Sequence, residues 1–265
     1  MKIFDPSSHQ AKKRFGQNFL HDMGIIDRIV SSMQLKVEDN ILEIGPGLGA
    51  ITKQILAITN SVDVIELDRD IIPKLKFNCD GLGDLRILQA DALKVDYSQF
   101  AQNSLLRVVG NLPYNISTPL LFHLFTYLDK IQDMHFMLQK EVVLRMAASP
   151  GTKTYGRLSV MTQSVCDVQM LFLVPPESFT PIPKVESAIV RLKPREKALQ
   201  IEDRKLFALI VMEAFNQRRK TLRNVWKKRI DAEVLESLGI NPTLRPEMVS
   251  LQEFVLVTNY LSKAE

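Results

Sequence analysis

The sequence predicts an α/β fold, with an open parallel sheet followed by a smaller all-α domain. Up to about residue 194, short apolar runs that suit buried strands alternate with helical patterns. A glycine-rich turn over residues 45–50 joins an apolar strand to a helix. From residue 195 onward this turn is not repeated and helical patterns dominate. We therefore predict two domains, 1–194 and 195–265.

The composition is that of an ordinary globular protein. With 46% hydrophobic and 24% charged residues, the chain can bury a core. No apolar run approaches the ~18 residues of a membrane span, and residues 1–6 lack the apolar core of a secretory signal. The two cysteines, Cys79 and Cys166, are far apart, and the four histidines have no metal-ligand spacing. We expect a soluble cytoplasmic protein without a disulfide, a metal or a membrane partner.

The first element is a helix over residues 25–33, which a basic, glycine-containing segment precedes. Asp22 is its predicted N-cap, because a short carboxylate can accept a hydrogen bond from the free main-chain N–H groups of the first turn. Gln17 and Asn18, just before it, are by themselves typical of a polar loop.

The next elements are a strand over 40–44, the glycine turn and a helix over 51–58. Glycines in this position let a ligand approach the backbone at the N-terminus of a helix. The Gly-x-Gly-x-x-Ala pattern of residues 45–50 also matches a dinucleotide-binding turn, so the glycines alone leave a nicotinamide cofactor and S-adenosylmethionine open. Glu43 favours the cationic S-adenosylmethionine, because a carboxylate would repel a pyrophosphate.

The following strands also end in polar side chains. Glu66 ends the second strand about 20 residues after the glycine turn, the distance expected for a contact with a ribose diol. Asp91 follows a third strand over 85–90, where it could accept from an adenine amino group, and Asn111 follows a fourth over 105–110. Each acid alone is typical of a loop or a helix cap. Their succession at strand ends predicts one ligand site.

The tetrapeptide Asn111-Leu112-Pro113-Tyr114 has the groups that a planar amine requires. The Asn side chain and the neighbouring peptide carbonyls are hydrogen-bond acceptors, the proline stiffens the turn, and the tyrosine has a flat aromatic face. We expect it to bind a base that carries an amino group.

The remaining elements of the first domain follow from the same patterns. We predict helices over 116–128 and 141–148, and strands over 133–139, 168–174 and 186–192. The four prolines between residues 175 and 183 predict an irregular loop. Phe179, in the middle of this loop, is unusual for a polar loop and by itself is compatible with a core position.

The second domain carries an uneven charge. Residues 216–229, the basic segment, hold seven basic side chains and no acid: Arg218, Arg219, Lys220, Arg223, Lys227, Lys228 and Arg229. Helical spacing predicts that several share one face, while Leu222 and Trp226 pack inward. Such a face is often merely solvated. An RNA partner is favoured because the first domain already implies a base as substrate.

The strand-end acids and the tetrapeptide resemble the Rossmann-type methyltransferases that modify the exocyclic amino group of adenine. Four further stretches are similar to the KsgA family of ribosomal RNA adenine dimethyltransferases: residues 17–20, 155–160, 175–185 and 215–224. The similarity covers nearly the whole chain.

This resemblance implies a function and a cofactor. The expected reaction is the dimethylation, by S-adenosyl-L-methionine, of two adjacent adenosines near the 3′ end of small-subunit ribosomal RNA. The partner would be an immature small ribosomal subunit, with residues 195–265 as the RNA-binding domain, and we expect a monomer.

The resemblance also implies roles for individual residues. The cofactor contacts would be Asn18, Leu20, Gly45, Glu66, Asp91 and Asn111, with Asn18 and Leu20 at the methionine end. The target base would contact Asn111, Leu112, Tyr114 and Phe179. The Asn111 side-chain oxygen and the Leu112 carbonyl would accept the two amino hydrogens, and the two aromatic rings would stack on the base.

Three other functions are compatible with part of the sequence. The Erm resistance methyltransferases perform the same chemistry on large-subunit RNA, but Leu112 and the stretches around residues 155–158 and 218–224 favour the small-subunit family. A non-catalytic RNA-binding assembly or transcription factor could keep the fold, although the cofactor and tetrapeptide residues are intact. A nicotinamide oxidoreductase is compatible with Ala50, but no hydride-transfer histidine or lysine is apparent.

Overall fold

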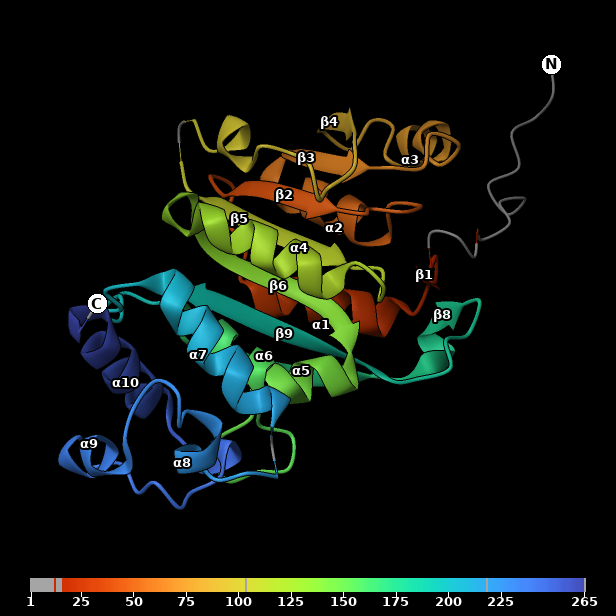
Figure 1. Cartoon of the computed structure of the whole chain (residues 1–265). Coiled ribbons are helices and arrows are strands. Elements are labelled where there is room, and N and C mark those ends of the chain that lie inside the picture. The colour runs from red at the N-terminus through yellow and green to blue at the C-terminus, as the bar shows by residue number, and fades with distance from the viewer. Residues whose placement is uncertain (1–11, 13–15, 103, 218, 265) are drawn as a thin grey trace. The chain divides into compact units, whose positions relative to one another are not determined.

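The computed structural model describes residues 12, 16–102, 104–217 and 219–264 (Figure 1). The chain forms two compact units, one of residues 1–143 and 169–194 and the other of residues 144–168 and 195–265. Residues 144–168, which the sequence-based boundary placed in the first domain, thus belong to the second unit by their contacts. Tyr155 and Val160 lie in the core of that unit, which explains the assignment.

The first unit contains a seven-stranded sheet with the order β4-β3-β2-β5-β6-β9-β7. The strands are β2 (Asn40–Ile44), β3 (Ser61–Glu66), β4 (Asp84–Gln89), β5 (Leu106–Asn111), β6 (Ile131–Gln139), β7 (Cys166–Val174) and β9 (Ser187–Pro194). The pairings among β2 to β6 are parallel, and β9 is antiparallel to β6. Since β3 and β5 lie on opposite sides of β2, the connections diverge at β2 and β5, where open sheets bind ligands. The predicted α/β fold is confirmed.

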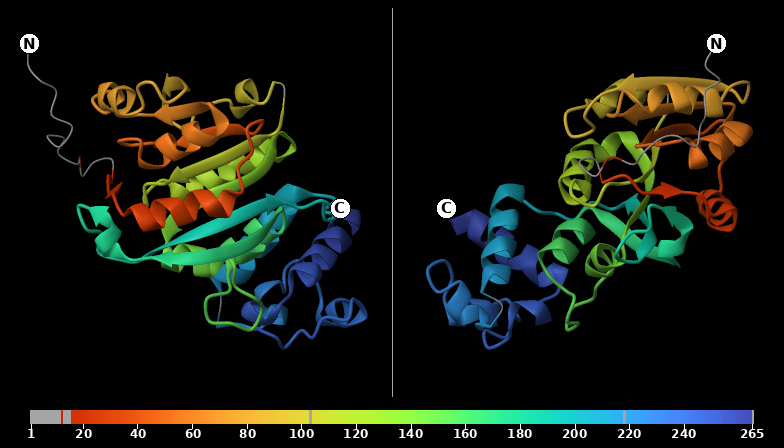
Figure 2. Two further views of the ribbon diagram at one scale, coloured as in Figure 1. Left: turned by 180° about the vertical axis from the view of Figure 1, so that it is seen from behind. Right: turned by 90° about the vertical axis from the view of Figure 1, so that its right-hand side faces the viewer.

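Helices cover both faces of this sheet (Figures 1 and 2). They are α1 (Met23–Met33), α2 (Ala50–Thr59), α3 (Ile72–Asn78) and α4 (Ser117–Leu124), with 3-10 turns η3 (Tyr97–Phe100) and η4 (Phe125–Lys130). The predicted cap of α1 is confirmed, because Asp22 Oδ1 accepts from Ile25 N at 3.2 Å. Helix α4 is shorter than predicted: Tyr127, at φ −120°, has left the helical region, and η4 replaces the last turns.

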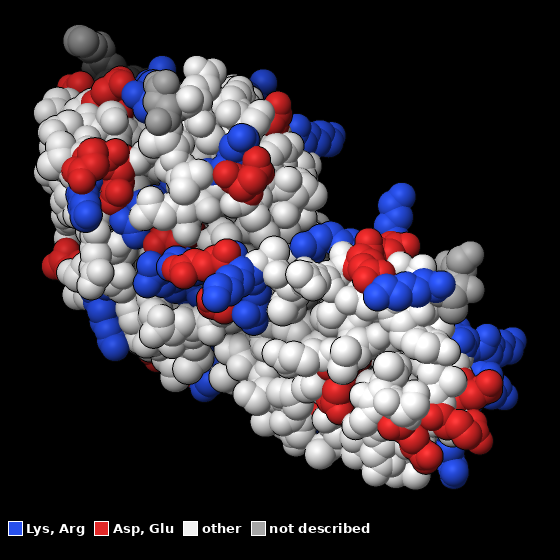
Figure 3. All heavy atoms as spheres, turned by 90° about the vertical axis from the view of Figure 1, so that its left-hand side faces the viewer, with Lys and Arg blue, Asp and Glu red and all other residues white. Residues whose placement is uncertain are grey.

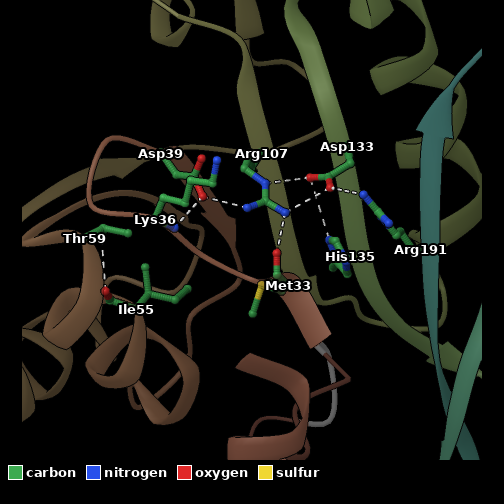
Figure 4. A network of polar contacts seen from close by, with 9 residues as sticks. All are labelled: Met33, Lys36, Asp39, Ile55, Thr59, Arg107, Asp133, His135 and Arg191. Atoms are coloured by element: carbon green, nitrogen blue, oxygen red, sulfur yellow. Dashed lines mark hydrogen bonds and ion pairs between the residues drawn. The ribbon is translucent and has the colours of Figure 1, made fainter. Parts of the chain in front are cut away.

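A buried ion-pair network ties the amino ends of β5 and β6 together (Figure 4). Arg107, 5% exposed, donates to both carboxylate oxygens of Asp133 at 2.9 and 3.0 Å and to Asp39 at 2.6 Å. Burial by itself raises the pKa of Asp133, but the hydrogen bond from Arg107 and the nearby positive charges outweigh it and hold that pKa below its usual value. The network fixes the sheet at the edge opposite the strand ends that hold the predicted site residues.

The proline-rich segment is more regular than predicted. It contains the 3-10 turn η5 (Pro176–Ser178) and the short strand β8 (Phe179–Thr180). β8 pairs antiparallel with β1 (Phe19–Leu20), and the partners are Phe19 with Thr180 and Leu20 with Phe179. The prediction of an irregular loop is wrong for Phe179 and Thr180. These two residues can pair as a strand because none of the four prolines lies among them.

The second unit is helical, as predicted for its C-terminal part. It contains α6 (Arg157–Gln163), α7 (Arg204–Asn216), α8 (Leu222–Val225), α9 (Ala232–Ser237), η6 (Pro246–Met248) and α10 (Leu251–Ala264), while α5 (Lys140–Met146) precedes them. Leu222 and Trp226 are fully buried, as predicted. Within the described ranges, no helix has the length and apolarity needed to cross a membrane.

Candidate functional site

A cavity of about 750 Å³ lies at the carboxyl ends of the parallel strands and is called here the strand-end cavity. Its volume falls in the range of roughly 300–1,000 Å³ that is usual for small-ligand sites. Its lining comprises residues 16–21, 43–48, 50, 51, 65–67, 71, 90–92, 111–116 and 180. Eight of the predicted site residues, Asn18, Leu20, Gly45, Glu66, Asp91, Asn111, Leu112 and Tyr114, lie in this lining. His21, to which the sequence assigned no role, also lies there.

The glycine turn forms the floor of the cavity beside β2. Gly45, at φ +68°, donates its N–H to the carbonyl of Ile65 in β3 at 2.9 Å. At Gly47, at φ +56°, an added Cβ would lie 3.3 Å from the ring of Phe19. The backbone thus packs tightly against Phe19, and α2 begins here at the N-cap Gly49 without a side-chain cap.

Glu43 is a buried carboxyl in the wall of the cavity. Burial raises its pKa to about 7, although a hydrogen bond from Thr52 Oγ1 at 2.6 Å works in the opposite direction. The nearby charge of Glu66 raises that pKa further. A positively charged ligand bound in the cavity would favour the ionised form of Glu43.

Glu66 and Asp91 are fixed by main-chain hydrogen bonds. Glu66 Oε1 accepts from the N–H of Asp68 at 2.8 Å. Burial raises the pKa of Glu66, and the hydrogen bonds from Asp68 and Gly47 partly offset this. Asp91 Oδ1 accepts from the N–H of Leu93 at 3.0 Å. Each carboxylate is therefore held in one orientation at the end of its strand.

The side-chain amide of Asn111 has a defined orientation. Its Nδ2 donates to the main-chain carbonyl of Asn18 at 3.1 Å. A carbonyl oxygen can only accept, so this contact requires the nitrogen on that side and leaves Oδ1 on the other. Among the described residues no donor contacts Oδ1 of Asn111 or the carbonyl oxygen of Leu112. The Leu112 N–H donates to Met137 at 3.2 Å, which fixes its peptide. Two acceptors thus remain for a ligand.

The two aromatic residues occupy different positions. The hydroxyl of Tyr114 lies 3.0 Å from Oγ of Ser187, which anchors the ring at the cavity. Phe179 is 1% exposed and belongs to the hydrophobic core of the first unit. In β8 it is the neighbouring Thr180 that lines the cavity. The structure therefore brings Tyr114, but not Phe179, together with Asn111, because adjacent strand residues point to opposite sides.

The sequence interpretation assigned no role to Asp68, a polar residue beside the cavity. Asp68 is 3% exposed and accepts from Gln17 Nε2 at 3.0 Å and from Lys12 Nζ at 2.6 Å. Burial would raise the pKa of Asp68, but these two hydrogen bonds hold it below its usual value. The only sequence signal for Asp68 was its place at the end of an acid-bearing strand.

The basic segment of the second unit is not one helix, and the prediction of a shared helical face is wrong. Helix α8 covers only Leu222–Val225, and turns precede and follow it. The exposed basic residues are Arg219, Lys220, Arg223, Lys227 and Lys228. Arg229 instead donates to Glu213 at 2.7 and 2.8 Å, and Arg218 lies outside the described residues. On the face drawn in Figure 3, acidic and basic side chains are intermixed.

No metal site is found in the part of the chain that the structure describes, since no group of three or more His, Cys, Asp or Glu is arranged to hold an ion. Cys79 and Cys166 are free and buried, as expected for core residues.

Sequence comparison places the chain close to known proteins over nearly its whole length. Residues 8–263 match the family model described as ribosomal RNA adenine dimethylase. "Ribosomal RNA small subunit methyltransferase A" of Marinobacter nauticus is 55% identical over 255 residues, which cover 96% of this chain and 92% of that protein. The protein of the same name from Saccharophagus degradans is 56% identical over 263 residues, 98% of each chain.

Structural comparison gives a consistent result. A dimethyladenosine transferase from Plasmodium falciparum superposes with a TM-score of 0.80 at 27% identity, covering 92% of this chain and 98% of that one. The 23S rRNA methyltransferase ErmE superposes with a TM-score of 0.75 at 22% identity, covering 92% of this chain and 100% of that one, which shows a shared fold.

Proposed function

The chain belongs to the ribosomal RNA adenine dimethylase family, and from this premise we propose that its strand-end cavity seats S-adenosyl-L-methionine beside an adenosine of small-subunit ribosomal RNA. The membership confirms the resemblance expected from the sequence motifs. The chain is an S-adenosylmethionine-dependent ribosomal RNA adenine dimethyltransferase. The proposal concerns how its own residues perform that reaction.

The volume of the cavity and its carboxyl groups suit this cofactor. Glu66 and Asp91, fixed at the ends of β3 and β4, would bind the ribose hydroxyls and the adenine amino group of the cofactor. Glu43, whose pKa is raised to about 7 by burial, favours a positively charged ligand in this wall. Asn18 and Leu20 would lie at its methionine end, as the family resemblance implies. When bound, the cofactor supplies an electrophilic methyl group.

Asn111 and Leu112 would prepare the target amine for reaction. The lone pair of an exocyclic adenine amine is delocalised into the ring, so the nitrogen is a poor nucleophile. Acceptance of its hydrogens by Asn111 Oδ1 and the Leu112 carbonyl would increase electron density on the nitrogen and orient it for in-line attack. The amine held by Asn111 and Leu112 would take the methyl group that the cofactor supplies, and its proton would then leave to water. No strong general base is required, because the alkylated nitrogen carries a positive charge.

Tyr114 would hold a base taken out of its stack. Extrusion costs a few kcal/mol, and stacking on one aromatic ring offsets about 1–3 kcal/mol of that cost. The hydrogen bond to Ser187 keeps the ring in place at 3.0 Å. Phe179, which the resemblance places against the base, is buried here and pairs with Leu20. We propose that it supports this wall of the cavity.

The exposed basic residues of the basic segment would bind the RNA backbone. Arg219, Lys220, Arg223, Lys227 and Lys228 are all exposed, as phosphate-binding side chains must be. The curated relatives carry the name of a small-subunit enzyme, so we propose an immature small ribosomal subunit as the substrate particle. A monomer acting in the cytoplasm, where such particles would be met, is the simplest form of this proposal.

The single observation that carries the proposed chemistry is the orientation of the Asn111 amide, which leaves Oδ1 as an acceptor. The test compares Asn111→Ala with the parent for transfer of labelled methyl groups to immature small subunits. We expect a loss of about 100-fold or more, which is the size of effect found when one preoriented hydrogen-bonding group is removed from an active site. Gln99→Ala, which removes an exposed amide, is the control and should keep the parent rate. A rate for Asn111→Ala within a few-fold of the parent would contradict the proposal.

A further inference from the structure

Hydrogen bonds among Lys12, Gln17 and Asp68, called here the clasp, connect the end of β3 to the segment that contacts Asn111. Asp68 follows Glu66 at the end of β3, and Glu66 fixes its main-chain N–H at 2.8 Å. The Asp68 side chain, almost fully buried, accepts from Gln17 Nε2 at 3.0 Å and from Lys12 Nζ at 2.6 Å. Gln17 Oε1 in turn accepts from the main-chain N–H of Lys12 at 2.8 Å. Gln17 is thus held at both ends of its amide.

The residue after Gln17 contacts the reaction site directly. Asn18 uses its main-chain carbonyl to accept from Asn111 Nδ2 at 3.1 Å. This carbonyl is what distinguishes the two possible orientations of the Asn111 amide, because a rotated amide would place two oxygens against each other. The position of the Asn18 carbonyl therefore decides whether Oδ1 or Nδ2 of Asn111 is presented to a ligand.

We propose that Asp68 is a positioning residue for methyl transfer, acting through Gln17 and the Asn18 carbonyl to keep the acceptor oxygen of Asn111 toward the target amine. This inference rests on the proposed function, since it assumes that Asn111 acts on the amine. The clasp is a short, charge-assisted set of hydrogen bonds between elements far apart in the sequence, so it restricts residues 17 and 18 more than the loop backbone alone could. Asp68 itself lies outside the lining of the cavity.

The clasp offers a matched pair of substitutions. Asp68→Ala removes the acceptor of Gln17, whereas Asp68→Asn keeps one oxygen that Gln17 can use. Asp70 is the control, because it accepts from the same Lys12 Nζ at 2.6 Å, has a 57% exposed side chain and does not touch Gln17. The readouts are the single-turnover rate of methyl transfer at saturating cofactor and subunit, the affinity for S-adenosylhomocysteine and the melting temperature.

We expect Asp68→Ala to lower the saturated rate by between about tenfold and a hundredfold, since a small misplacement of a reacting group has effects of this size. Asp68→Asn should recover part of that loss, and Asp70→Asn should stay within about twofold of the parent, because the bond between Gln17 and Asp68 is unchanged. The decisive arm is the double variant Asp68→Ala with Asn111→Ala. It should be no slower than Asn111→Ala alone, because the orientation of an absent amide has no effect.

Three results would overturn the inference. The first is a saturated rate for Asp68→Ala within about twofold of the parent. The second is that Asp68→Ala lowers the saturated rate by the same factor in the Asn111→Ala variant as in the parent. This would mean that Asp68 acts independently of Asn111 or only on folding. The third is a parent-like rate for Asn111→Ala, which contradicts the proposed function as well. Loss in Asn111→Ala without loss in Asp68→Ala contradicts the inference alone.

Discussion

The amide nitrogen of Asn111 lies 3.1 Å from the carbonyl oxygen of Asn18, a residue 93 positions earlier in the chain. An aspartate at position 111 could not donate to this carbonyl, and two oxygens would face each other. We expect Asn111→Asp to lose at least about tenfold in methyl-transfer rate although it retains acceptor oxygens, because the side chain would turn away from Asn18. Single-turnover assays with labelled cofactor measure this. Equal activity of the two proteins would show that the Asn18 contact is unimportant.

The buried carboxyl of Glu43 gives the folded protein a defined pH dependence. Its pKa is about 7 in the folded chain against 4.5 for the free side chain. The folded state therefore holds a proton that the unfolded state releases above pH 4.5, so this contribution to stability is complete below 4.5 and is lost as pH rises through about 7. Glu43→Gln cannot ionise and keeps an acceptor for Thr52.

We expect Glu43→Gln to match the parent in melting temperature at about pH 5 and to exceed it at about pH 8, measured without cofactor. The exposed Glu38→Gln should leave the melting temperature unchanged at both values. The same difference between Glu43→Gln and the parent at both pH values would rule out ionisation of Glu43 as the cause.

The Arg107 network predicts a large loss of stability on neutralisation of Asp133. Asp133→Asn would leave the 5% exposed guanidinium of Arg107 without its principal counter-charge. Removal of one partner of a buried pair costs about 3–5 kcal/mol, whereas an exposed pair contributes at most about 1 kcal/mol. Asp129→Asn, at a 70% exposed carboxylate paired with Lys130, is the matched control. Urea unfolding followed by circular dichroism measures both, and equal midpoints for the two variants would contradict the prediction.

Reversal of charge in the basic segment should weaken RNA binding selectively. The triple change Arg219→Glu, Lys220→Glu and Arg223→Glu is expected to lower affinity for small-subunit RNA by at least about tenfold. The slope of log K against log salt should also become shallower by roughly 0.7 for each phosphate that the protein no longer binds. Cofactor affinity should remain that of the parent. Filter binding over a series of salt concentrations and equilibrium dialysis with S-adenosylmethionine provide the two measurements.

The control for that experiment removes the same charge elsewhere. Lys36, Lys53 and Lys76 are exposed residues of the first unit, and their change to Glu leaves the basic segment intact. If this control weakened RNA binding as much as the triple change, net charge rather than the basic segment would be responsible.

Local patterns were sufficient to predict most of the sheet and most of the side chains that line the strand-end cavity. Short apolar runs ending in Glu66, Asp91 and Asn111 identify buried strands and the edge at which they end, because side-chain burial and strand length are local properties. The order in which these strands pair depends on contacts between distant residues, and the proposed grouping of their ends relied on a general rule for open sheets.

The features that were missed are all non-local or very short. Strands β1 and β8 have two residues each, too few for any periodic signal, and they pair across about 160 positions. The clasp of Asp68 on Gln17 links residues 51 positions apart. In the basic segment, charge spacing predicted a shared helical face, but the turns beside α8 end the helix after four residues.

The pairing of β1 with β8 also has a consequence in time. Residues 19 and 20, which line the cavity, are held by residues 179 and 180, so this wall cannot be secured until a ribosome has made and released the later strand. At about 5–20 residues per second, synthesis of the intervening chain takes roughly 8–32 seconds. The nascent chain therefore completes its glycine turn and strand-end acids before it completes the strand that holds residues 19 and 20, and the strand-end cavity gains this wall only after translation has passed β8.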